Sequence, residues 1–83
     1  MNRFIIYQYI NRLTKDDIYN FSLKQGINIS NHDIDIIYNY IKNDNMRIFN
    51  KPIEILNEVK DKLANDVYNK ILELYDKYKN YLK

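Results

Sequence analysis

Gly26 and Pro52 are the only glycine and the only proline in this chain of 83 residues, and they divide a pattern that is otherwise helical. Gly26 can take a positive φ just after the end of a helix. Pro52 suits a first helical turn, where its missing N–H costs nothing. Elsewhere apolar residues recur three and four positions apart, which is typical of amphipathic helices. The sequence therefore predicts an all-α protein.

We expect a compact bundle of four to five short helices in a single domain spanning residues 1–83. A chain of this length has room for one small core, and it has no cysteine for a disulfide or a thiolate metal site. Its stability must come from helix packing, with self-association as a further source. The predicted helices cover residues 3–12, 15–25, 31–43, 52–63 and 66–82.

Two of the predicted helices begin with recognisable caps. Thr14 offers an N-cap oxygen, and Asp16 and Asp17 place negative charge in the first turn, where the helix dipole favours it. Ser30 caps the third helix, with Asp33 at the N3 position as in a weaker capping box. Local chemistry therefore predicts where these two helices start.

The third helix has the clearest apolar stripe, so we expect it at the centre of the core. Ile36 and Tyr40 add a second stripe to the same helix. The residues that we expect to be buried are Ile18, Phe21, Ile34, Ile37, Tyr38, Ile41, Val59 and Leu63, together with Ile55 or Leu56.

Before Pro52 we expect a loop. Asn43–Asn45 breaks the helical pattern, yet Met46, Ile48 and Phe49 follow it. An apolar loop usually fills a gap between helices, so Ile48 and Phe49 should reach the core.

The segment Ala64–Asp66 fits either a tight turn or continued helix, because only Asn and Asp weaken the helical propensity there. We favour a turn. Beyond it, apolar residues recur at alternating spacings of four and three, as in a coiled-coil seam: Val67, Ile71, Leu74, Tyr78 and Tyr81. We expect this stripe to pack on the domain's own core.

The sequence contains no catalytic or metal-binding constellation. His32 is the only histidine. Adjacent residues on a helix diverge by about 100°, so the spacing places no second imidazole or carboxylate reliably beside it, although Asp33 and Asp35 are near in sequence. The acidic residues lie in first helical turns, where caps and dipoles already explain them. A Gly-rich phosphate loop needs more than one glycine. We therefore expect no enzyme activity, no cofactor, no metal and no small-molecule substrate.

No apolar run approaches the roughly 18 to 20 residues that span a bilayer. Met1–Ile10 begins like a signal peptide, but Gln8 and Asn11 interrupt its apolar run and no small-residue cleavage site follows. We expect this segment to belong to the fold, and the protein to be cytoplasmic and free of membrane contact.

The remaining hypothesis is an interaction module that binds another protein or itself. Tyrosine brings apolar area and a hydrogen-bonding group at low entropic cost, which suits an interface. The candidate partner-binding residues are Arg47, Phe49, Tyr68, Tyr75 and Tyr78.

Nucleic-acid binding is the alternative, through the lysines and tyrosines that alternate along the last helix. It is disfavoured because the net charge is only +2 and acidic residues offset those lysines. A helix-turn-helix across Gly26 is disfavoured as well, since Asp33 and Asp35 would repel phosphate where a recognition helix meets the groove.

Lys24–Ser30, with Ile37 and Ile41 and then Arg47–Asn50, resembles a family of small cytoplasmic proteins from low-GC Gram-positive bacteria. That family is known as a domain of unknown function. The resemblance implies a bacterial, non-enzymatic, all-helical protein. Family members tend to have a Ser/Thr-Pro helix break where this chain has Ala64–Asp66, which leaves open whether the last two helices are separate.

Overall fold

The computed structural model describes the backbone of residues 3–81 and the side chains of residues 8–80. Over these residues the chain is all-α, as predicted, and has no strand. The number of α-helices is six, one more than the largest number expected. They are α1 (Arg3–Arg12), α2 (Lys15–Lys24), α3 (Asn31–Asn43), α4 (Asn45–Asn50), α5 (Pro52–Val59) and α6 (Asn65–Tyr78), followed by the 3-10 turn η1 (Lys79–Tyr81).

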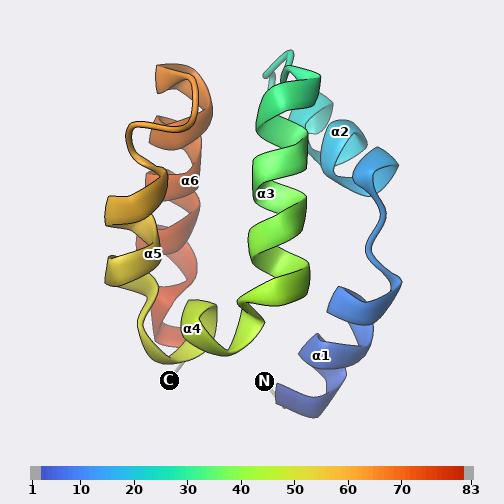
Figure 1. Ribbon diagram of the computed structural model, residues 1–83, viewed down its shortest axis with the longest axis vertical. Coiled ribbons are helices and arrows are strands. Elements are labelled where there is room, and N and C mark those ends of the chain that lie inside the picture. The colour runs from blue at the N-terminus through green and yellow to red at the C-terminus, as the bar shows by residue number, and fades with distance from the viewer. Residues whose placement is uncertain (1–2, 82–83) are drawn as a thin grey trace.

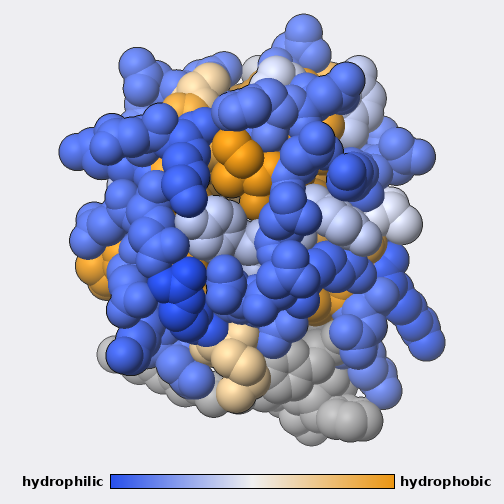
Figure 2. Space-filling view, in the orientation of Figure 1, coloured by the Kyte–Doolittle hydropathy of each residue, from blue (hydrophilic) through white to orange (hydrophobic). Residues whose placement is uncertain are grey.

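The central helix α3 separates two groups of helices (Figure 1). α1 and α2 lie on one side of it, α5 and α6 lie on the other, and α4 crosses below to connect the two sides. α3 and α6 run in the same direction, so their N-termini lie at the same end of the molecule. The face in view over α3 and α5 is mainly hydrophilic, with scattered apolar patches (Figure 2).

The predicted caps are present. The Thr14 hydroxyl accepts the N–H of Asp17 at 3.1 Å, and the Asp17 carboxylate accepts the N–H of Thr14 at 2.9 Å. The Ser30 hydroxyl accepts the N–H of Asp33 at 3.1 Å. Gly26 has a φ of +78°, the left-handed conformation that favours glycine. Local chemistry thus fixes the starts of α2 and α3 and the end of α2.

The predicted loop before Pro52 is wrong, because residues Asn45–Asn50 form the helix α4. Phe49 is buried and Ile48 packs against the core, as expected, while Met46 is exposed. α4 has no side-chain N-cap. The Arg47 side chain instead ties α4 to α5. The spacing of apolar residues does not reveal such a contact, so the sequence pattern does not predict α4.

The last two helices are separate, as we favoured, but the turn lies earlier than predicted. α5 ends at Val59 rather than at residue 63, and α6 begins at Asn65. The connection is formed by residues 60–64, and Asp66 lies in the first turn of α6, where its charge suits the helix dipole. α6 ends at Tyr78 rather than at residue 82, and Lys79–Tyr81 form the 3-10 turn η1. Residue 82 and the Tyr81 side chain lie outside the part of the chain that the structure describes.

The buried core gathers where α3 and α6 begin. Its members are Ile18, Ile29, Ile34, Ile55, Val59, Leu63 and Val67. We call the region around Ile29, Ile34, Leu63 and Val67 the closed end of the α3–α6 pair. The opposite region, around Ile41, Leu74 and Tyr78, is the open end, where these side chains are at most partly buried.

Four of the expected core residues differ from the prediction. Phe21 is 49 % exposed, although its spacing from Ile18 predicted burial. Ile37, Tyr38 and Ile41 are only partly buried. Phe21, Ile37 and Ile41 line a hollow beside α2. Hydrophobic periodicity does not show whether a neighbouring helix covers such residues.

Candidate protein-binding grooves

The closed end is held by a buried carboxylate. Asp33 in α3 is 3 % exposed, and one of its oxygens accepts the N–H of Ala64 at 2.9 Å. Ala64 is the N-cap residue of α6, so α3 supplies the cap that α6 lacks in its own sequence. The other Asp33 oxygen lies 2.9 Å from Nδ1 of the exposed His32. This carboxylate therefore has a structural role in joining two helix N-termini.

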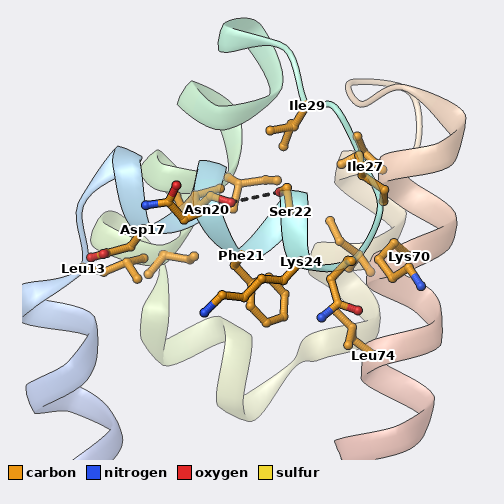
Figure 3. Close-up of a pocket in the computed structure, with 16 residues that line it drawn as sticks. Leu13, Asp17, Asn20, Phe21, Ser22, Lys24, Ile27, Ile29, Lys70 and Leu74 are labelled. Atoms are coloured by element: carbon orange, nitrogen blue, oxygen red, sulfur yellow. Dashed lines mark hydrogen bonds between the residues drawn. The ribbon is translucent and has the colours of Figure 1, made fainter.

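A groove of about 610 Å³ lies between α2, α3 and α6, and it extends from Ile29 and Val67 at the closed end to Ile41 and Leu74 at the open end. We call it the α2 groove. Its apolar lining is supplied by Leu13, Ile18, Phe21, Ile27, Ile29, Ile37, Ile41, Val67, Ile71 and Leu74. In Figure 3 the Phe21 ring extends from α2 into the opening, with Leu13 on one side and Leu74 of α6 on the other.

Three of the polar side chains on the rim of the α2 groove have partners within the chain. Asp17 accepts the N–H of Thr14 in the capping box. The Ser22 hydroxyl donates to the carbonyl oxygen of Ile18 at 2.9 Å, as drawn in Figure 3. The Lys70 ammonium donates to Glu73 at 3.1 Å. The groove thus combines an apolar interior with a rim of mixed charge.

A second groove, of about 360 Å³, lies between α3, α5 and α6, and we call it the α5 groove. It is lined by Ile37, Tyr40, Ile41, Ile48, Pro52, Ile55, Leu56, Val59, Leu63, Ile71, Leu74, Tyr75 and Tyr78. Its surface is almost entirely apolar. Four side chains line both grooves, namely Ile37, Ile41, Ile71 and Leu74. At the open end, therefore, one layer of side chains connects α3 to α6.

Arg47 is the centre of an ion-pair network that joins α3, α4 and α5. Its guanidinium donates to Glu54 at 2.8 Å and to both carboxylate oxygens of Glu58, at 2.5 and 3.2 Å. The Tyr40 hydroxyl donates to Glu58 at 3.0 Å. These contacts raise the pKa of Arg47, and the bonds from Arg47 and then Tyr40 lower the pKa of Glu58. The network holds α4 and α5 in place beside the open end.

Comparison with known protein families matches residues 1–79 to a family described as a protein of unknown function, DUF2624. The chain belongs to the DUF2624 family. The matched range includes every residue that lines the two grooves. Searches of curated proteins and of solved structures found no match.

The structure of this DUF2624 chain separates the five residues that the sequence proposed for partner binding. Tyr75 and Tyr78 line the α5 groove, and Tyr78 is half-exposed. Tyr68 packs against the core. Phe49 is 7 % exposed, which leaves its ring little surface to offer a partner. The Arg47 guanidinium is used in the network with Glu54 and Glu58.

The sequence does not predict the α2 groove, because its spacing places Phe21 in the core and Leu74 in a stripe that faces the core. The one sequence feature that points to the groove is the length of the apolar stripe on α6. This stripe is longer than a small core can cover, so part of it must stay uncovered, and the uncovered part lines the groove.

The lysines of α6 and η1 lie beside acidic or aromatic side chains. Lys70 pairs with Glu73, and Lys79 pairs with Asp76 at 2.9 Å. The Lys77 ammonium lies 5.4 Å from the centre of the Tyr78 ring. The nucleic-acid alternative stays disfavoured, because Glu73 and Asp76 offset the positive charge of this surface.

The described part of this DUF2624 chain contains neither a cluster of metal ligands nor a membrane-spanning helix. No three His, Cys, Asp or Glu residues between positions 3 and 81 gather closely enough to hold a metal ion. No helix within the same range is both long enough and apolar enough to cross a membrane.

Proposed function

We propose that this DUF2624 protein is a small non-enzymatic helical module that acts by binding another protein or itself. The observation that carries the proposal is the apolar interior of the α2 groove, with the half-exposed Phe21 ring at its opening. Apolar surface left in water favours any partner that covers it, by about 25 cal/mol for each Å² removed from water.

The shape of the two grooves supports a protein ligand. Each lies between helices and offers apolar positions along α3 and α6, which suits the side chains of a partner helix. Tyr75 and Tyr78 in the α5 groove add hydroxyl groups to an otherwise apolar surface. Grooves with this composition can bind side chains through burial and shape.

A non-enzymatic role is supported by how the polar side chains are used. In the α2 groove, Asp17 caps α2 and Ser22 bonds to Ile18. Neither lies beside a histidine that would activate a nucleophile, since His32 pairs with Asp33 at the closed end. The resemblance to small cytoplasmic proteins of low-GC Gram-positive bacteria supports a place in the bacterial cytoplasm.

The proposal is tested by affinity purification from extract of the native organism at low and high salt. The wild-type chain is compared with Phe21→Asp, which places a charge at the α2 groove, and with Ile53→Asp. Ile53 is 54 % exposed on α5 and lines neither groove, so it is a matched control.

We expect a protein that wild type and Ile53→Asp retain at both salt concentrations and that Phe21→Asp loses. A partner retained equally by all three chains would contradict a role for the α2 groove. Nucleic acid released by salt would support the alternative instead. A wild-type chain that is monomeric at high concentration and retains no partner would overturn the proposal.

A further inference from the structure

We propose that the occupant of the α2 groove is a second copy of this chain, with the Phe21 ring of each copy inserted into the α2 groove of the other. This inference rests on the proposed function and names its partner. It assigns the exposed face between α2 and α6 to a symmetric dimer interface.

The groove and the group that would fill it lie on the same face. A two-fold symmetric interface uses one patch on both copies, so that patch must fit itself. Phe21 lies at the opening of a hollow that Ile71 and Leu74 of α6 also line. Figure 3 shows its ring between α2 and Leu74. A half-exposed aromatic ring beside an apolar hollow meets this requirement, because rotation by half a turn places each ring over the other copy's hollow.

The charges on the rim are also self-complementary. Asp17 stands on the α2 side, while Lys24 and Lys70 stand towards the connector and α6. A rim of one sign would repel its own copy, whereas a mixed rim lets a carboxylate of one copy face an ammonium of the other. The same mixture gives little advantage to a strongly acidic or strongly basic partner.

The exposed area of the chain is large enough for such an interface. The chain exposes 6020 Å², whereas a monomeric protein of its mass is expected to expose about 5,300 Å². The difference of about 700 Å² is close to the roughly 800 Å² that each partner buries in an interface of standard size. The most buried of the described side chains, Asp33, still keeps 3 % of its surface exposed.

The test is sedimentation equilibrium of the full chain from about 1 μM to about 1 mM, a range that covers weak and moderate affinities. We expect wild type and Ile53→Asp to dimerise within this range. We expect Phe21→Asp to raise the Kd at least about 100-fold, because an aromatic anchor is lost and a carboxylate is placed against an apolar wall. Circular dichroism of each variant confirms that its helices are retained.

A second measurement locates the interface without relying on the Phe21 variant. The chain has no cysteine, so Leu23→Cys provides a single attachment site for a nitroxide spin label, at an exposed residue of α2 that lines neither groove. In a mixture of spin-labelled and isotope-labelled copies, we expect intermolecular broadening at Phe21, Ile71 and Leu74 and none at Ile53.

A wild-type chain that stays monomeric at the highest concentration overturns the dimer, as does broadening confined to another face. Neither result removes the proposed function if the extract experiment still finds a partner that depends on Phe21. The two proposals can therefore fail separately.

Discussion

The two ends of the α3–α6 pair are built from similar residues but packed differently. On α3, Ile34 and Ile41 lie two turns apart on one face, and Val67 and Leu74 have the same spacing on α6. Ile34 and Val67 are buried, while Ile41 and Leu74 line both grooves. The difference arises from what surrounds each pair rather than from the pair itself.

The closed end is covered by the connections between helices. Ile29 precedes α3 and Leu63 precedes α6, and both are buried. The Asp33 carboxylate then joins the two helix starts through the N–H of Ala64. At the open end, the Arg47 network instead fixes α4 and α5 to each other. Between α3 and α6 there is only the single layer of side chains that lines both grooves. We therefore assign stability to the closed end and recognition to the open end.

The largest expected effect is the difference in stability lost when Ile34 or Ile41 is replaced by alanine. Ile34→Ala should lower the free energy of unfolding by about 3 kcal/mol, since it leaves a cavity in a closed region. Ile41→Ala should lower it by about 1 kcal/mol, because its surroundings are partly open to solvent. Urea unfolding followed by circular dichroism at low protein concentration measures both. Equal losses would contradict the distinction between the two ends.

The next effect concerns the contact that closes one end. Asp33→Ala should lower the free energy of unfolding by about 2 kcal/mol, because the partly buried N–H of Ala64 loses its acceptor. The matched control is Thr14→Ala, a local cap at an exposed helix start, which should lower it by about 1 kcal/mol. Thermal unfolding at neutral pH compares the two. A smaller loss for Asp33→Ala than for Thr14→Ala would show that the contact between α3 and α6 does not hold the closed end.

A smaller effect tests the network beside the open end through pH. The bonds from Arg47 and Tyr40 hold the pKa of Glu58 below its ordinary value of 4.5. A lowered pKa in the folded state contributes stability above pH 4.5 that is lost as the pH falls through the folded-state value. Glu58→Gln should therefore unfold at a lower temperature than wild type at pH 7 and lose less on acidification. Parallel pH profiles for the two proteins would contradict this role of Glu58.

Much of the fold could be predicted because it depends on local chemistry. The bounds of α1 and α3, the caps at Thr14 and Ser30 and the positive φ at Gly26 all follow from residues near one another in the sequence. α4 could not be predicted this way, since its stability comes from Arg47 reaching Glu54 and Glu58 across Pro52. The position of the turn before α6 likewise depends on a distant residue, Asp33.

The grooves were harder to predict than the helices. Hydrophobic periodicity identifies the apolar face of a helix, but it does not say which neighbouring helix packs against that face. Phe21 follows Ile18 by three residues and looks like its partner in the core, yet only Ile18 is buried. The sequence identifies the tyrosines of α6 as a group. It does not show which of them pack against the core and which line a groove, because that depends on where α5 lies.

The most direct test of this assignment follows the isoleucine methyl groups of the wild-type chain by NMR as its concentration is raised from about 10 μM to about 1 mM. Ile34 lines neither groove and Ile55 lines only the α5 groove, whereas Ile41 and Ile71 line the α2 groove that the second copy enters. We expect the Ile41 and Ile71 methyl signals to shift with concentration while those of Ile34 and Ile55 stay fixed. Constant Ile41 and Ile71 signals, or shifts of similar size at all four residues, would contradict an open end that receives a second copy.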